Sequence, residues 1–316
     1  MSESEKPRLG VSACLLGQPV RFDGGHKRCR FLLEDCQSFF EFHSMCPEAE
    51  LGLGIPRPVI QLRRFDTDTR LVYSKQRSRD LTADMADYAT TRIQQLPVLD
   101  GFVFKKDSPS CGPFRVPVYD DRTGMRQRDG VGLFARTFMA AHPDVPVEDE
   151  GRLNDKAIRE NFLERVYAHY RWRHISDADT NLAAFQAFHR DYKLMLMAKS
   201  NSGAKQLGRL VASANRDNLA ELRKTYFRQF MVVMKNRPSP GQHVNVLMHV
   251  MGYLKHRLDH HDKVELLNWF ESYRQQQVDR VTPLVLLQHH FRRHPHEYIA
   301  GQYYFEPYPL QLMQPV

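Results

Sequence analysis

The chain has 316 residues, of which 42% are hydrophobic and 26% charged, with a mean hydropathy of −0.54. No run of about 18 consecutive apolar residues occurs, so the sequence predicts no transmembrane helix, and five irregularly spaced cysteines do not indicate a disulfide framework. A chain of this length predicts two domains. Because its first residues have no apolar signal core, we expect a cytoplasmic protein.

The net charge of +8 is divided unevenly along the chain. Residues 1–150 carry 21 Lys and Arg against 22 Asp and Glu, whereas residues 151–316 carry 24 against 15. This division indicates chemistry in the first part and binding of a polyanion by the second. A basic surface that only keeps the protein soluble explains the charge equally well.

Strand and helix patterns alternate in the first half of the chain. This alternation predicts right-handed crossovers and a mostly parallel sheet, as in a Rossmann-like α/β domain. The expected strands are RLGVSACLL ending at Cys14, FFEFHSM (39–45) and LDGFVF (99–104). The expected helices cover 29–42, 77–96 with Ser78 or Asp80 as its cap, and 131–143.

A change of pattern at VPVEDEGRLND (145–155) predicts a boundary between domains 1–152 and 153–316. Beyond it, apolar residues recur three and four positions apart, which predicts an all-α domain. The expected helices cover 181–198, 218–235, 244–258 and 263–277. The aromatic, proline-rich tail 296–309 is expected to wrap back over a domain.

Three cysteines, Cys14, Cys46 and Cys111, lie where apolar runs break into turns. Ligands of an open parallel sheet gather at the carboxyl ends of its strands, so the fold would bring the three thiols together. Any one of them alone is better explained as a small buried residue. Cys29 and Cys36, in a helix-like stretch, lack this turn context.

Three thiolates without a neighbouring histidine favour an iron–sulfur cluster over zinc. Structural zinc usually takes four ligands with a short CxxC pair, which this sequence lacks. A catalytic zinc ion can take three protein ligands, so the number of cysteines does not exclude zinc. The histidine tract 289–296 lies among arginines, which favours a solvated or phosphate-facing segment.

Polar residues close to these cysteines could carry proton chemistry. Glu48 stands two residues after Cys46, and Ser108 three before Cys111. The alternatives are a surface carboxylate and a turn-forming serine. Three further residues are candidates for substrate contact. Asp23 is either a turn residue or orients a polar ligand, and Lys105 and Lys106 lie where an anion would be stabilised.

The blocks SACLLGQPVRFDGG, CPE with its following glycines, and FKKDSPSCG closely resemble the thiouracil desulfidase family over about the first 150 residues. The resemblance implies an α/β domain that holds a 4Fe-4S cluster through Cys14, Cys46 and Cys111. It also implies that Glu48 and Ser108 are catalytic residues. The cluster would serve as a Lewis acid for the substrate's sulfur, with Glu48 moving protons.

The second half resembles a helical domain found fused to this desulfidase domain. Such fusions are similar to tRNA 4-thiouridine desulfidases, which implies tRNA as the substrate. A desulfidase of free thiouracil or its nucleotides, and a non-catalytic iron–sulfur RNA-binding protein, are the alternatives. The expected RNA contacts are Lys199, Lys205, Arg209, Arg216, His243, Asn245, Lys255 and Arg257, with His243 and Asn245 favoured because they lie near an expected helix start.

Overall fold

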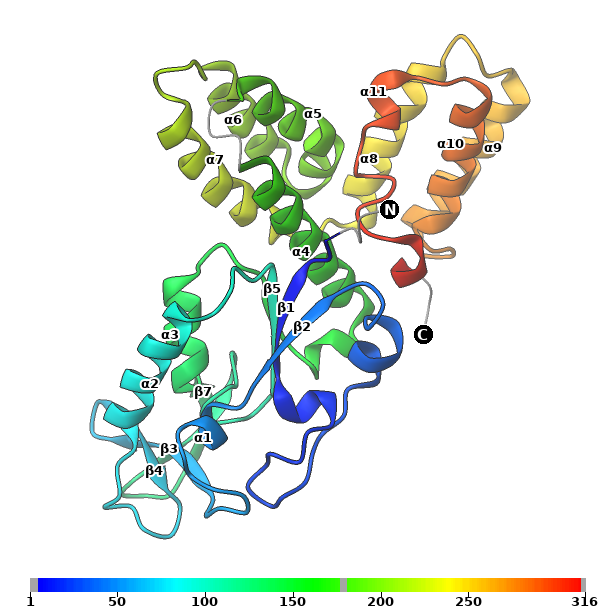
Figure 1. The fold of residues 1–316 in the computed structure, drawn as a ribbon. Coiled ribbons are helices and arrows are strands. Elements are labelled where there is room, and N and C mark those ends of the chain that lie inside the picture. Colours follow the sequence, from blue (N-terminus) through cyan, green and yellow to red (C-terminus); the bar gives the residue numbers. More distant parts are fainter. Residues whose placement is uncertain (1–4, 177–180, 314–316) are drawn as a thin grey trace. The chain divides into compact units, whose positions relative to one another are not determined.

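The protein is described by a computed structural model that covers residues 5–176 and 181–313 and forms two compact units (Figure 1). The first unit runs to Tyr170 and includes the segment from Gln311, and the second covers Arg171–Leu310. The division therefore falls inside helix α4 (Lys156–Ser176), beyond the expected boundary at residue 152. The first turns of α4 belong to the first unit because they pack on its sheet.

The first unit contains a four-stranded sheet, sheet A, with the order β2-β1-β5-β8. All of its neighbouring strands are parallel, which confirms the predicted α/β fold. The strands are β1 (Arg8–Ser12), β2 (Glu41–Met45), β5 (Gly101–Phe104) and β8 (Val147–Asp149). The segment expected to be the domain boundary contains an edge strand, β8, which was not predicted because three residues are too few to show a strand period in sequence.

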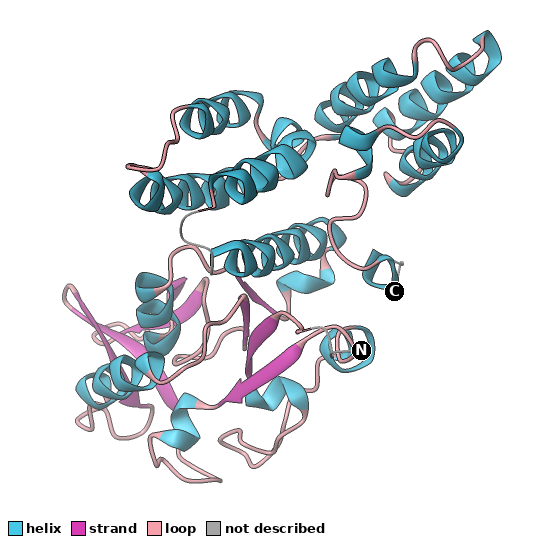
Figure 2. Ribbon diagram, turned by 45° about the horizontal axis from the view of Figure 1, so that its top comes forward, coloured by secondary structure: helices cyan, strands magenta, loops and turns pink. Residues whose placement is uncertain are grey.

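Helices cover both faces of sheet A (Figure 2). On one face, Phe102 and Phe104 of β5 pack against Phe134 and Phe138 of α3 (Leu133–Ala141), beside α2 (Thr82–Gln94). On the other face α4 approaches closely, because Gly101 has no side chain: a Cβ there would lie 2.7 Å from Val166. Because successive side chains of a strand point to opposite faces, β5 packs against α3 on one face and against α4 on the other.

A second sheet, sheet B, was not predicted from the sequence. It has the order β4-β3-β6-β7 and mixes antiparallel hairpins with one parallel pair. Its strands are β3 (Ile60–Phe65), β4 (Asp68–Tyr73), β6 (Val116–Asp120) and β7 (Arg126–Gly130). Leu62, Leu71 and Val118 join it to the core of α2 and α3.

The helix expected over 29–42 is largely wrong. Only one π-helical turn, Phe31–Asp35, forms before β2 begins at Glu41. The amphipathic pattern of residues 29–42 forms only this short helical turn. The helix does not continue because Glu41 to Met45 pair with β1 as a parallel strand. The helix expected over 77–96 is confirmed in shortened form, and Asp80 accepts a hydrogen bond from the Thr82 N–H at its start (2.8 Å).

The second unit is helical, as predicted. Its helices are α5 (Leu182–Lys199), α6 (Asn201–Ala212), α7 (Leu219–Met234), α8 (Pro240–Met251), α9 (His260–Arg274), α10 (Val281–Arg293) and α11 (Glu297–Ala300). Its core is aromatic: the Trp172 ring stacks on Phe227 with 4.7 Å between centroids, and Phe185 meets Tyr226 edge to face. Within the ranges 5–176 and 181–313, no helix is long and apolar enough to cross a membrane.

The aromatic tail packs into the helical unit, as predicted. Tyr304 and Tyr308 are almost fully buried, and the Arg171 guanidinium donates a hydrogen bond to the Pro307 carbonyl (2.7 Å). The tail therefore contributes to the core of this unit.

Candidate active site

The three cysteines singled out by their turn context follow three adjacent strands of sheet A. Cys46 comes directly after β2, Cys14 lies in the turn after central β1, and Cys111 lies in the loop after β5. All three line one cavity of about 350 Å³ at the carboxyl ends of these strands. The parallel sheet therefore brings together residues that are 32 and 65 positions apart.

Backbone hydrogen bonds fix the two loops that present Cys14 and Cys111. The Cys14 carbonyl accepts a hydrogen bond from the Lys27 N–H (2.9 Å), and the Cys111 N–H donates to Ser108 Oγ (3.1 Å). Gly132 permits the close packing of the second loop, because a Cβ there would lie 2.5 Å from the Ser110 carbonyl oxygen. The main chain at Cys14 and Cys111 is thus held in place by neighbouring residues.

Burial raises the pKa of all three thiols. The pKa of Cys14 rises to about 11, through burial and the neighbouring Cys46, with Lys105 acting in the opposite direction. The pKa of Cys111 rises well above its ordinary value through burial, then through Glu48 and Cys46, and the pKa of Cys46 rises through burial. Such thiols ionise when a metal centre supplies positive charge.

The donor set of the cavity is made of soft sulfur groups. The three cysteines line a cavity of about 350 Å³. Soft thiolate ligands without imidazole are those that iron–sulfur clusters take.

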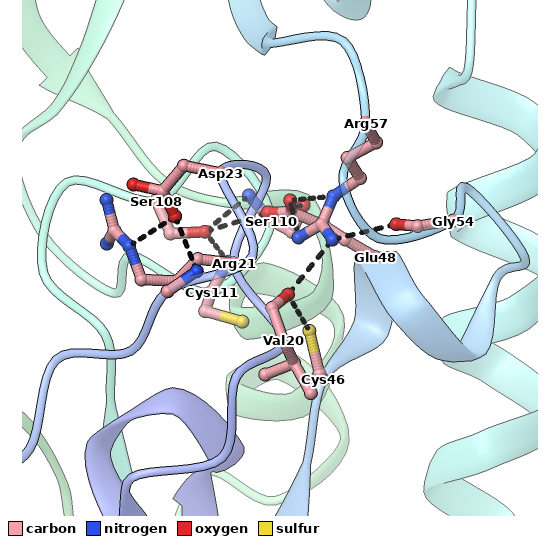
Figure 3. A network of polar contacts seen from close by, with 11 residues as sticks. Val20, Arg21, Asp23, Cys46, Glu48, Gly54, Arg57, Ser108, Ser110 and Cys111 are labelled. Atoms are coloured by element: carbon pink, nitrogen blue, oxygen red, sulfur yellow. Dashed lines mark hydrogen bonds and ion pairs between the residues drawn. The ribbon is translucent and has the colours of Figure 1, made fainter.

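Glu48 lies in the same cavity, in the short helix α1 (Pro47–Glu50), and is held on both of its oxygens (Figure 3). Arg57 donates two hydrogen bonds to Oε2, from Nε at 3.1 Å and from Nη2 at 2.7 Å. The hydroxyls of Ser108 and Ser110 donate to Oε1, at 3.3 and 3.0 Å. The carboxylate is therefore oriented, with one oxygen anchored and the other beside two hydroxyl groups.

Arg57 and Ser110 were not predicted from the sequence. The Arg57 side chain is only 3% exposed, and its Nη1 also donates to the Val20 and Gly54 carbonyls. An arginine between prolines in a loop carries no periodic signal, so only the fold reveals its partner. Ser110 could have been noticed because it stands one position before Cys111.

The carboxyl end of β8 contributes a carboxylate that holds Lys105. Lys105 and Lys106 line the cavity, and Glu150 forms an ion pair with the Lys105 ammonium group. The other Glu150 oxygen accepts the Lys106 N–H at 2.7 Å. Asp23 does not line the cavity: its carboxylate accepts the Gly25 N–H (3.0 Å), which makes it a turn residue.

Most of the expected RNA contacts are exposed, but two are not. Lys199 and His243 are only 4% and 6% exposed, and His243 Nδ1 lies 3.0 Å from the Tyr304 hydroxyl. The expectation for His243 failed because α8 begins at Pro240, which turns this residue into the core. The exposed candidates are Lys205, Arg209, Arg216, Asn245, Lys255 and Arg257.

The fold and the cavity define an α/β domain with a cysteine-rich candidate active site, joined in one chain to a helical domain. Residues 9–150 match the family model described as 2-thiouracil desulfurase, and residues 193–309 match that of a protein of unknown function, DUF1722. The N-terminal part of the chain is therefore similar to the 2-thiouracil desulfurase family, and the C-terminal part to the DUF1722 family.

Two individual proteins are similar to parts of this chain. The uncharacterized protein YbgA of Escherichia coli K12 is 28% identical over 158 residues, which cover 50% of this chain and 94% of YbgA. The solved structure of a 4Fe-4S-dependent thiouracil desulfidase, TudS, is 28% identical. The match covers 47% of this chain and 94% of that one, with a TM-score of 0.36.

Proposed function

We propose that this protein is a desulfidase that converts 4-thiouridine in tRNA to uridine and releases sulfide. The observation that carries the proposal is the convergence of Cys14, Cys46 and Cys111 with Glu48 in one cavity of a 2-thiouracil desulfurase domain. The reaction replaces the thiocarbonyl sulfur by the oxygen of water, so it needs a site for sulfur and a group that moves protons.

The three thiols are the residues that would hold a 4Fe-4S cluster. With three protein ligands, such a cluster would supply an iron with an open position as a soft Lewis acid for sulfur. Its positive charge would also offset the effect of burial, which otherwise keeps the thiols protonated. Their chemistry and shared cavity support this assignment.

Glu48 is the group that we assign to proton transfer. Arg57 anchors one carboxylate oxygen, so the other, which accepts hydrogen bonds from neutral hydroxyl groups, would accept a proton from an attacking water and return one to the product. Ser108 and Ser110 donate to this second oxygen and would orient the water or the pyrimidine. A proton acceptor with a fixed direction is what an attack on a thiocarbonyl carbon requires.

The charge of the helical domain favours a polynucleotide substrate over a free base. Exposed cations lie along α6 and α7 and in the turn between them: Lys205, Arg209, Arg216 and Arg228. Phosphate groups along an RNA backbone would be bound by such a surface. A free thiouracil carries no phosphate and would gain nothing from it.

The test of the proposed function is the nucleoside content of tRNA after incubation with anaerobically reconstituted protein. We expect 4-thiouridine to decrease and uridine to increase, with sulfide released in the same amount. Mass spectrometry of the digested tRNA measures this change. Unchanged 4-thiouridine, with turnover of free 4-thiouracil, would move the assignment to a small-molecule desulfidase. Absence of both activities would contradict the enzyme assignment.

Reversing two charges on α6 should weaken tRNA binding. We expect Lys205→Glu with Arg209→Glu to reduce the slope of log K against log salt by about 2, one per lost phosphate contact. Turnover of 4-thiouridine monophosphate should stay unchanged. Lys75→Glu, an exposed charge reversal in the first unit, is the matched control. Equal effects of the control and the α6 variant would contradict this role of α6.

A further inference from the structure

Phe22 places an exposed aromatic ring at the cavity that holds the cysteines. It lines this cavity together with Glu48 and Cys46, and it is 39% exposed. Val59, 44% exposed, lines the cavity too. Large apolar side chains left in water beside polar and ionic groups are typical of a wall that a ligand covers.

The backbone under this ring is tied to the catalytic machinery. The Phe22 carbonyl accepts the Arg57 N–H (2.9 Å), and the Val20 carbonyl accepts Arg57 Nη1 (2.9 Å). The same arginine anchors Glu48 through its Nη2 and Nε. The position of Phe22 is therefore set relative to the carboxylate, which pre-organises the ring for a ligand.

Cationic groups accompany the ring. The Arg21 guanidinium carbon lies 5.4 Å from the centre of the Phe22 ring, and Arg21, Lys27 and Lys106 line the cavity. An aromatic face combined with cations is the arrangement with which proteins bind unstacked bases and their phosphates. Its occupant would be a planar, anionic nucleotide.

We propose that Phe22 is the stacking platform for the thiolated pyrimidine and thereby selects a flat aromatic base. This inference rests on the proposed function and adds the residue that binds the base. Because the backbone of Phe22 is tied to the residue that anchors Glu48, a base on this ring would be held at a fixed position relative to that carboxylate. Stacking on the Phe22 ring would replace the stacking on neighbouring bases that the thiolated base loses when it leaves its place in the tRNA.

The first test is the activity of Phe22→Ala on 4-thiouridine in tRNA. Alanine substitution of a stacking aromatic should lower kcat/KM about 5- to 150-fold, and Phe22→Tyr should restore most of it. Phe65→Ala is the matched control, since the Arg70 guanidinium carbon likewise lies 5.2 Å from the centre of that ring, outside the cavity. Equal kcat/KM for wild type and Phe22→Ala would overturn the proposal.

The second test measures binding without turnover, so its outcome does not depend on desulfidase activity. Wild-type protein should bind uridine 5′-monophosphate more tightly than 5,6-dihydrouridine 5′-monophosphate, whose saturated ring does not stack. Calorimetry measures both affinities. Phe22→Ala should bind the two equally, with an unchanged melting temperature. Discrimination that persists in Phe22→Ala would overturn the platform, whereas wild-type discrimination without desulfuration would contradict the proposed function alone.

Discussion

Replacement of Cys14, Cys46 or Cys111 by alanine is expected to abolish iron binding and desulfidase activity together. After anaerobic reconstitution, the wild-type protein should contain about four iron atoms per chain and absorb light at about 400 nm. Each variant should lose this absorption, because two remaining thiolates leave the cluster without a third ligand. Iron analysis and absorption spectra of the same samples measure the loss.

Cys29→Ala is the matched control for this experiment. Cys29 is partly exposed and outside the cavity lining, and burial raises its pKa as it does for the three predicted ligands. It should retain iron, colour and activity. A colourless wild-type protein that binds one zinc ion, or loss of iron in Cys29→Ala equal to that in Cys14→Ala, would contradict the assignment of the cluster ligands.

The second large effect is expected from Glu48→Gln, which should lower kcat by about 10² to 10⁴ while the absorption of the cluster persists. The amide keeps the shape of the side chain but accepts no proton. Single-turnover rates on thiolated tRNA, measured beside the cluster spectrum, separate lost proton transfer from lost cofactor. A kcat within about threefold of the wild type would contradict the catalytic role of Glu48.

Arg57→Met should lower both activity and stability, since it leaves the Glu48 carboxylate without its buried partner. Removing one member of a buried pair costs about 3–5 kcal/mol. The double variant Glu48→Gln/Arg57→Met should be more stable than Arg57→Met alone. Arg63→Met is the matched control: this arginine is also buried and pairs with Asp121 at 3.1 Å, so it should lose stability and keep kcat.

Long elements with a clear period were predictable from the sequence. The amphipathic helices α2, α3 and α5 and the buried strands β1 and β5 lie where their patterns place them. The strands β8 and β7 were not predictable from the sequence, because β8 has only three residues and β7 is almost entirely polar. β8 becomes a strand by pairing with β5, which is distant in sequence, and β7 by pairing with β6 across a hairpin, and local composition records neither pairing.

Some residues of the candidate site were likewise predictable from the sequence, and others were not. The turn context of Cys14, Cys46 and Cys111 was visible in the sequence, because glycine, proline and serine mark the ends of apolar runs. The partners of Glu48 were not visible: Arg57 is nine positions away in a loop, and Ser110 is sixty-two positions away. The ring of Phe22 likewise belongs to the cavity only through the path of its loop.

The sequence by itself determined the division into an α/β part and a helical part, the three cysteines that line one cavity, and the excess positive charge of the second half. Only the tertiary structure decided which side chains hold Glu48, that Glu150 holds Lys105, and that His243 is buried. The reason is physical. The period of apolar residues and the turn residues determine secondary structure locally along the chain. Ion pairs and cavity walls depend instead on where the ends of parallel strands lie in space.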